Sequence, residues 1–428
     1  MTRFLGDVWT ALWSGWSGRL RGEAVLVLQS RFVNLMVGAA FVVLTARHLG
    51  PVGRGEIAVA FALAWATSSL ADLGTSVSGR IGLLRQDSRV SASDVISLTL
   101  VLVPLQAGLA VVAVTAVSFT SARMSVGLSV AVVLLSVAIT VYNSVVSVVY
   151  GLRRYQTVLV ADIVMAVVQV AVLSYLLVVN RLTSVSAVVA MAAGFLVAAA
   201  VLVVRSGASW RQSPSQLTAH WRELIASGLS PMAGAFASVV ALRFNRLVLA
   251  AVVGSRSVGL FAVALTIPET LRNVAKAVGQ VIADRGRSGV DSVDVAKKHC
   301  QLFVFANCGV LIVGTTLGWL LLPTLFGAGF TEAREVLVVV TVAEVAMSVH
   351  LMGQAMLVGF GSPRGIGLPQ IVGAVVTVLL NVAMVPRWGI QGAAWACLLG
   401  FSVLAVASSL WAKYEIERAA VMPQSGLR

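Results

Sequence analysis

The stretch AFASVVALRFNRLVLAAVVG (residues 235–254) is almost wholly apolar, yet Arg243 and Arg246 lie inside it. The hydrocarbon core of a bilayer is about 30 Å thick, and a helix of about 20 apolar residues crosses it. The stretch is therefore predicted to span a membrane. Arginine is among the most costly residues to place in hydrocarbon, so each of the two requires a partner, a watery cavity or a ligand.

The composition of the whole chain agrees with a membrane protein. Hydrophobic residues make up 58% of the 428 residues and charged residues only 11%, which excludes a soluble domain or a disordered chain. The three cysteines fall in apolar segments, so we interpret them as small hydrophobic residues and expect neither a disulfide framework nor a metal or cofactor site. The net charge of +14 is attributed to short basic loops between spans, and no nucleic acid partner is expected.

Twelve apolar runs are long enough to span the membrane, which predicts an all-α fold. They cover residues 25–46, 56–79, 94–119, 124–150, 156–179, 184–204, 226–253, 257–283, 300–322, 333–358, 363–385 and 389–412. The longest connection is polar and divides the spans into two groups of six. We expect an interfacial amphipathic segment over 1–24, a six-helix lobe over 25–204, a linker over 205–225, a second six-helix lobe over 226–412 and a tail over 413–428.

The distribution of basic residues predicts the orientation. If both termini are cytoplasmic, nineteen Arg and Lys residues lie in inner segments and seven in outer loops. Inner loops of membrane proteins carry the excess of positive charge, so we expect both termini in the cytoplasm. In the first 24 residues, leucines and tryptophans recur at helical spacing with Arg19 and Arg21 nearby. This favours a helix in the cytoplasmic interface, with a disordered tail as the alternative.

The two halves of the chain contain a weak repeat. LGPVGRGEIAVAFAL (49–63) aligns without a gap with VGSRSVGLFAVALTI (253–267), so that Gly50 matches Gly254 and Gly55 matches Gly259. Both stretches form the turn after the first span of a half and the start of the next span. Repeated halves that enclose a site between them are common among transporters.

Three further segments resemble bacterial polysaccharide flippases. LFGAGFTEAREVLVVVTVAEVAMSVHLMGQAMLVGFGSPR (325–364), LVLAAVVGSRSVGLFAVA (247–264) and Pro386 with GIQGAAWACLLG (389–400) occur in the order and spacing of that family. The family is the Wzx-type branch of the multidrug/oligosaccharidyl-lipid/polysaccharide (MOP) exporter superfamily. Many members carry an aspartate just before the second of these segments, where this chain has Asn245 and Arg246.

The resemblance implies a MATE-like fold, with two six-helix lobes in a V around a central cavity. It implies a bacterial cytoplasmic-membrane transporter that moves an undecaprenyl-pyrophosphate-linked oligosaccharide from the inner to the outer leaflet by alternating access. A polysaccharide polymerase and glycosyltransferases are candidate partners. A multidrug or cation antiporter of the same superfamily, a lipid II flippase and a membrane scaffold are the alternatives.

Charged residues inside the predicted spans are the candidate site. The bases are Arg31, Arg243, Arg246, Arg272 and Lys276, and the acids are Asp72, Asp162, Glu269 and Glu344. Spacings of three and four place Arg243 with Arg246, and Glu269 with Arg272 and Lys276, on common helix faces. Because guanidinium forks bind phosphate oxygens bidentately, we expect the five bases to bind the pyrophosphate of the substrate.

Other roles remain open for several of these residues. Arg246 and Lys276 can alternatively snorkel toward the interfaces. Asp72 and Glu269 are the candidates for ion coupling, with charge pairing as the alternative, and Asp162 is expected near the cytoplasmic interface. The chain has no phosphate loop, zinc-protease or hydrolase motif, which indicates a secondary transporter and not an enzyme.

Overall fold

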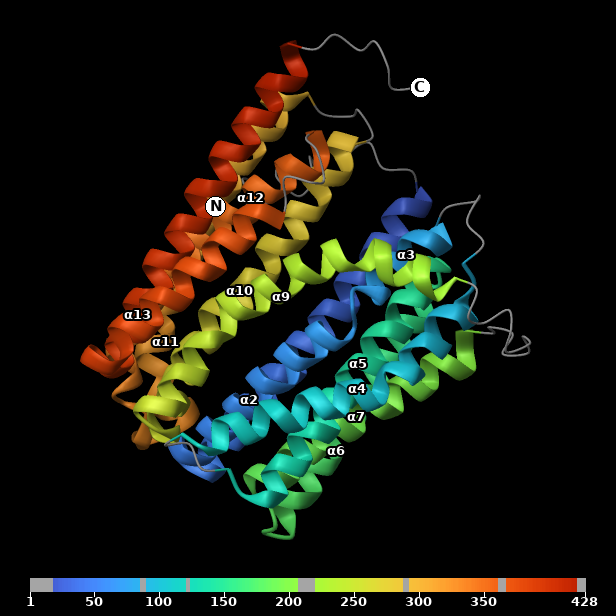
Figure 1. The fold of residues 1–428 in the computed structure, drawn as a ribbon. Helices are drawn as coiled ribbons and strands as arrows, with labels where there is room; N and C mark the ends of the chain where they lie inside the picture. The colour runs from blue at the N-terminus through green and yellow to red at the C-terminus, as the bar shows by residue number, and fades with distance from the viewer. Residues whose placement is uncertain are drawn as a thin grey trace.

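The computed structural model describes residues 18–84, 90–120, 124–206, 220–287, 292–360 and 367–421, and this part of the chain is helical (Figure 1). The elements are α2 (Gly18–Ala71), α3 (Thr75–Leu84), α4 (Ala92–Ser118), α5 (Val126–Gly151), α6 (Tyr155–Val178), α7 (Ser184–Ser206), α9 (Trp221–Val252), α10 (Ser255–Arg287), α11 (Val293–Phe326), the 3-10 helix η1 (Ala328–Phe330), α12 (Ala333–Phe360) and α13 (Gly367–Val421). The predicted all-α class is confirmed.

Among the described residues, ten helices are long and apolar enough to cross a membrane, whereas twelve spans were predicted. The difference arises in α2 and α13, which each cover two predicted spans. In α2 the backbone leaves helical geometry at Gly50 (φ 66°, ψ −172°). The rings of Phe41 and Phe61 lie 6.2 Å apart, although a straight helix would separate them by about 30 Å. The chain therefore doubles back at Gly50.

The second long helix, α13, reverses in the same way. Its backbone leaves helical geometry at Gly389 (φ 55°, ψ −128°). A Cβ added to Gly400 would lie 2.3 Å from Oγ1 of Thr377, so the two halves of α13 are in direct contact. Glycine is suited to both reversals because it has no Cβ to oppose a positive φ.

Helix starts follow local capping signals, and most predicted spans agree with the helices to within a few residues. Ser91 and Asp94 form a reciprocal capping box at the start of α4, which satisfies two backbone donors. Ser292 caps α11, so this helix begins at Val293 instead of at the predicted residue 300. The helix α13 continues to Val421, into the predicted tail. The predicted segment 1–24 and linker 205–225 fall largely on residues outside the described part of the chain.

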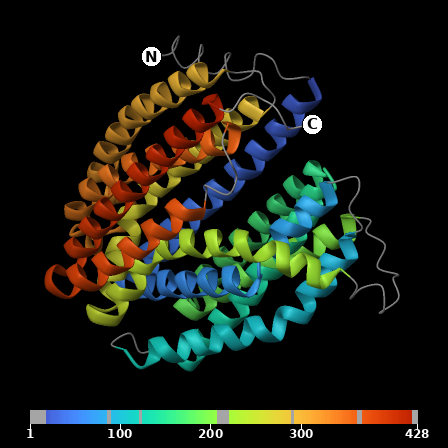
Figure 2. The ribbon, with the colours of Figure 1, turned by 45° about the horizontal axis from the view of Figure 1, so that its top comes forward.

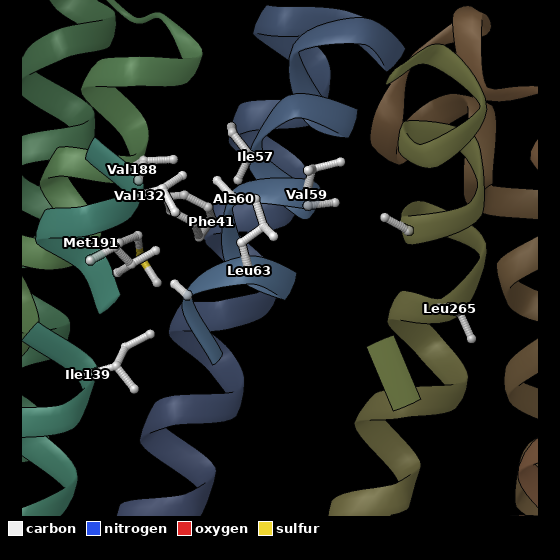
Figure 3. Packing of buried hydrophobic residues seen from close by; sticks show 14 of the residues in the cluster. Phe41, Ile57, Val59, Ala60, Leu63, Val132, Ile139, Val188, Met191 and Leu265 are labelled. Carbon is white, nitrogen blue, oxygen red and sulfur yellow. The ribbon is translucent and has the colours of Figure 1, made fainter. Parts of the chain in front are cut away.

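The helices form two lobes that diverge from one common end (Figures 1 and 2). Helices α2 to α7 make up the first lobe and α10 to α13 most of the second. The helix α9 connects them, because Ser78 of α3 donates to the Leu224 carbonyl near its start (2.9 Å) and Asn245 near its end donates to Sγ of Cys397 in α13 (3.0 Å). The core of the first lobe contains many small and branched side chains, including Ala60 and Val132 (Figure 3).

The repeated glycines bring the two lobes into contact. Gly50 and Gly254 both have positive φ, 66° and 109°, and they turn the chain at the same end of the molecule, here named the glycine-turn end. A Cβ on Gly55 would lie 1.7 Å from the Ser255 carbonyl oxygen, and one on Gly259 would lie 1.9 Å from a backbone oxygen of α2. The repeat-related helix starts therefore touch backbone to backbone, which closes this end.

Candidate functional site

A row of four charged side chains, here named the charge row, crosses from α9 through α10 to α12. Nη2 of Arg246 lies 2.7 Å from Oε1 of Glu269, and Glu269 lies 4.0 Å from Nη2 of Arg272. Arg272 then donates to Glu344 through Nε (2.8 Å) and through Nη2. The two-pronged contact is the geometry in which a guanidinium and a carboxylate bind most strongly. The row alternates in sign along its length.

Three of the four side chains of the charge row are buried inside the protein. Arg246, Arg272 and Glu344 are 4%, 7% and 1% exposed. Buried charges are tolerated when they are paired and hydrogen-bonded, and each of these has an opposite charge within 4.0 Å. Arg246 therefore does not snorkel toward the outer interface.

Two further arginines border the charge row. The guanidinium of Arg243 lies over the ring of Trp65 of α2 (5.6 Å), and its charge interacts with those of Arg246, Glu269 and Arg272. Arg54 of α2 is buried, its Nε has no hydrogen-bond partner, and its charge interacts with Arg246 and Glu269. Arg54 was one of the seven basic residues that the sequence placed in outer loops, but it lies inside α2, because the helix resumes directly after the turn at Gly50.

The charge row and its two neighbours have an excess of positive charge. Four arginines stand against two glutamates in this part of the structure, which leaves two positive charges without a carboxylate. One terminal nitrogen of Arg246, Nη1, is also buried without a hydrogen-bond partner. A bound anion is the chemical group that such a cluster is suited to receive.

A cavity of about 460 Å³ lies in the second lobe beside the charge row. Arg272, Lys276 and Gln280 of α10 line it, together with His350 and Gln354 of α12. Nδ1 of His350 lies 3.3 Å from the Leu404 carbonyl oxygen, which accords with a buried structural role. The face of α9 that contributes to this cavity contains Ser238, Ala241 and Leu242.

A second cavity, of about 360 Å³, lies in the first lobe against the middle of α9. It is here named the first-lobe cavity. Its lining is Ser30, Asn34, Trp65, Ser68, Ser69, Asp72, Gly74, Ser76, Val77, Arg80, Thr140, Tyr142, Asn143, Val146, Ser147, Tyr150 and Asp162, with Pro231, Met232, Ala235 and Val239 of α9. Asp162 was expected near the interface, but it is 1% exposed and accepts hydrogen bonds from Ser30 and Tyr142.

The predicted site residues are thus distributed over three places. Arg243 and Arg246 of α9 and Arg272 of α10 meet at the charge row, whereas Lys276 is exposed at the second-lobe cavity. Of the ion-coupling candidates, Glu269 belongs to the charge row and Asp72 to the first-lobe cavity.

Four further residues remain to be placed: Arg31, Arg54, Glu344 and Asp162. Arg31 lies in α2, and its side chain is outside the described part of the structure. Arg54 was not predicted as a site residue, and Glu344 and Asp162 were named among the intramembrane acids without a binding or coupling role, since their partners lie in other helices. A charged residue within an apolar run was the only signal for Glu344, whose partner Arg272 is 72 positions away.

Comparison with known proteins identifies the family. A sequence model described as polysaccharide biosynthesis protein matches residues 20–282, which is more than half of the chain. The chain belongs to the polysaccharide biosynthesis protein family. This polysaccharide biosynthesis protein is a multi-pass membrane protein, as the sequence predicted. No curated protein matches it in sequence.

Solved structures show that the fold of this polysaccharide biosynthesis protein is MATE-like. It resembles an inward-facing multidrug resistance MATE family transporter of the MOP superfamily, with a TM-score of 0.70 at 14% identity over 94% of this chain and 100% of the other. An outward-facing transporter of the same description gives 0.56 at 16% identity over 93% and 95%. A eukaryotic MATE transporter gives 0.60 at 14% identity over 93% and 97%.

Proposed function

We propose that this protein is a transporter that moves a lipid-linked oligosaccharide from the inner to the outer leaflet by alternating access. The observation that carries the proposal is the excess of two positive charges in the charge row taken together with its neighbours Arg54 and Arg243. A diphosphate linkage has one negative charge on each phosphate group, so a substrate headgroup matches the excess in sign and in size. Guanidinium groups bind phosphate oxygens in pairs, and membership of the polysaccharide biosynthesis family supports a glycan on the diphosphate.

Among the predicted bases, Arg243 is the one we assign to first contact with the diphosphate. In the described part of the chain it forms no ion pair, and its guanidinium lies over the Trp65 ring. Arg272 already donates two hydrogen bonds to the Glu344 carboxylate, so its charge is largely compensated. Arg246 offers the unpartnered Nη1 as a second donor. Arg31 and Lys276 remain proposed contacts on the approach from the cytoplasmic side.

An apolar cavity supports a place for the isoprenoid chain. It measures about 420 Å³ and lies between α2, α10 and α11, lined by apolar side chains such as Val43, Leu271 and Val313 and by two threonines. Thr270, one of these threonines, directly follows Glu269 of the charge row in the chain. An apolar cavity beside an anion site is the arrangement that a lipid diphosphate requires.

The proposed topology has twelve crossings, with α2 and α13 each crossing twice, and both termini in the cytoplasm. The reversals at Gly50 and Gly389 support this count. In α10, the second-lobe cavity begins at Arg272, seventeen residues beyond the helix start, which is about 25 Å from the glycine-turn end. With that end outside, the cavities face the cytoplasm.

Of the alternatives, a cation antiporter is disfavoured, because the buried excess charge is positive and repels a cation. A lipid II flippase shares the diphosphate chemistry. The polymer that cells fail to export when the protein is removed distinguishes these two flippase functions.

The experiment measures binding of inorganic pyrophosphate to the purified chain in nanodiscs and export of surface polysaccharide in cells. Arg243→Ala is expected to weaken binding about tenfold to a hundredfold, because a charge-assisted hydrogen bond contributes about 1.5–3 kcal/mol. Arg243→Lys is expected to recover part of it, since lysine keeps the charge but not the fork. Arg181→Ala, which removes an exposed arginine after α6, is the control. Normal binding and export with Arg243→Ala, at normal membrane abundance, contradict the proposal.

A further inference from the structure

The first-lobe cavity differs in chemistry from the charge row, and apart from the ion-coupling candidate Asp72 its lining has no role assigned above. Its lining is dominated by hydroxyl groups of serine, threonine and tyrosine, with two carboxylates, two amides and a tryptophan. Arg80 is the basic residue in this lining, and it lies over the ring of Tyr150 (5.1 Å). The cavity is therefore a polar, aromatic-walled site that is not built for a second anion.

The carboxylates in this cavity are already engaged by hydroxyl donors. Asp72 accepts from the Ser76 hydroxyl (2.6 Å), the Thr75 hydroxyl (3.2 Å) and the Ser144 hydroxyl (3.4 Å). Asp162 accepts from Ser30 of α2 and Tyr142 of α5. These contacts connect several helices and hold the polar wall in one arrangement. Carboxylates occupied in this way are poor ligands for a metal ion or an organic cation.

The side chains that remain available are amides. Asn34 of α2 and Asn143 of α5 are half-buried in the lining, and neither forms a hydrogen bond with the described part of the chain. An amide offers donors and an acceptor from one group, which complements the hydroxyl groups of a sugar. The half-buried Trp65 ring provides a flat apolar surface on which a sugar ring stacks. This combination recognises a neutral, hydroxyl-rich ligand.

The position of the cavity relates this ligand to the diphosphate. Trp65 lines the cavity, and its ring is the one under the guanidinium of Arg243 (5.6 Å). A group attached to a phosphate at Arg243 would therefore lie against Trp65. We propose that the first-lobe cavity binds the sugars next to the diphosphate, with Asn34 and Asn143 as the groups that read their hydroxyls. The inference rests on the proposed function.

The size of the cavity limits how much glycan it binds. About 360 Å³ is near the lower end of the range for small-molecule sites, about 300–1,000 Å³. The cavity accordingly takes the first sugars after the diphosphate, and the rest of the oligosaccharide extends toward the open side. Specificity would then depend on the sugars closest to the lipid.

The test is calorimetric titration of the full chain in nanodiscs with two probes. One is the repeat-unit oligosaccharide released by mild acid from the surface polysaccharide of cells that depend on this protein. The other is inorganic pyrophosphate. The Asn34→Ala, Asn143→Ala double variant is expected to weaken oligosaccharide binding about tenfold to a hundredfold, since two hydrogen bonds are lost, and to leave pyrophosphate binding unchanged. Gln301→Ala, which removes an exposed amide of α11 outside all three cavities, is the matched control.

A second measurement does not depend on truncation. The thiol of an Asn143→Cys variant is expected to react several-fold more slowly with an alkylating reagent when the oligosaccharide is present, with the modified peptide resolved by mass spectrometry. Unchanged oligosaccharide affinity in the double variant, or no protection of this thiol, overturns the sugar site. Loss of pyrophosphate binding in the Arg243→Ala variant is a separate result, so failure of the diphosphate model and failure of the sugar site are told apart.

Discussion

Replacing Arg272 by alanine is expected to destabilise the protein more than any other single truncation in the charge row. The Arg272 and Glu344 side chains are 7% and 2% exposed, and they share two hydrogen bonds. Arg272→Ala leaves the Glu344 carboxylate buried without a cation. Removal of one partner of a buried ion pair costs about 3–5 kcal/mol, and the lost interaction with Glu269 at 4.0 Å adds to it.

The matched comparison is Arg243→Ala, which removes an arginine of the same region without orphaning a carboxylate. Its contact with the Trp65 ring (5.6 Å) contributes about 0.5–2 kcal/mol. A second comparison replaces both partners, as Arg272→Met with Glu344→Leu. Exchange of a buried ion pair for apolar side chains is often neutral or stabilising, so the double variant is expected to regain most of the stability.

The assay is thermal unfolding of each variant in nanodiscs, followed by intrinsic fluorescence, with the yield of monodisperse protein measured in parallel. The expected order of melting temperature is wild type, then Arg243→Ala close below, then Arg272→Ala well below both. If Arg272→Ala melts with the wild type, the ion pair is not buried in the folded protein. If the double variant melts as low as Arg272→Ala, the orphaned carboxylate is not the cause.

Three further outcomes are expected. Gly55→Ala forces a Cβ to within 1.7 Å of the Ser255 carbonyl oxygen, so it should separate the lobes at the glycine-turn end and expose a cysteine placed at the buried Val258. The control is Gly108→Ala, because a Cβ at Gly108 has no atom within 4 Å. If the cysteine at position 258 is unreactive in both backgrounds, this contact does not close the end. A membrane-impermeant thiol reagent added outside should label a cysteine placed at Ser255 and not one placed at Ser288, and the reverse pattern would invert the topology. Asp72→Asn or Glu269→Gln should abolish the dependence of transport on a pH gradient in vesicles, whereas unchanged dependence in both variants excludes the two acids as coupling sites.

The fold was largely predictable because its strongest constraint acts locally. Each span must be long and apolar enough to cross the bilayer without help from the rest of the chain, and α4 to α12 accordingly lie close to the predicted apolar runs. The repeat at Gly50 and Gly254 was also visible in the sequence. The sequence did not reveal that Gly55 and Gly259 touch. These two glycines are 204 positions apart in the chain and belong to different lobes, so their contact depends on the tertiary packing.

The sequence by itself determined that this protein spans a membrane many times, that its halves are related and that arginines lie where hydrocarbon makes them costly. Only the tertiary structure decided which charges neutralise one another. Arg272 pairs with Glu344, 72 residues away, and Ser30 bonds Asp162, 132 residues away, whereas the faces shared within one helix predicted neither pair. Span formation depends on the summed hydropathy of neighbours in the chain, but charge pairing depends on distance in space, which the packing of α9, α10 and α12 sets.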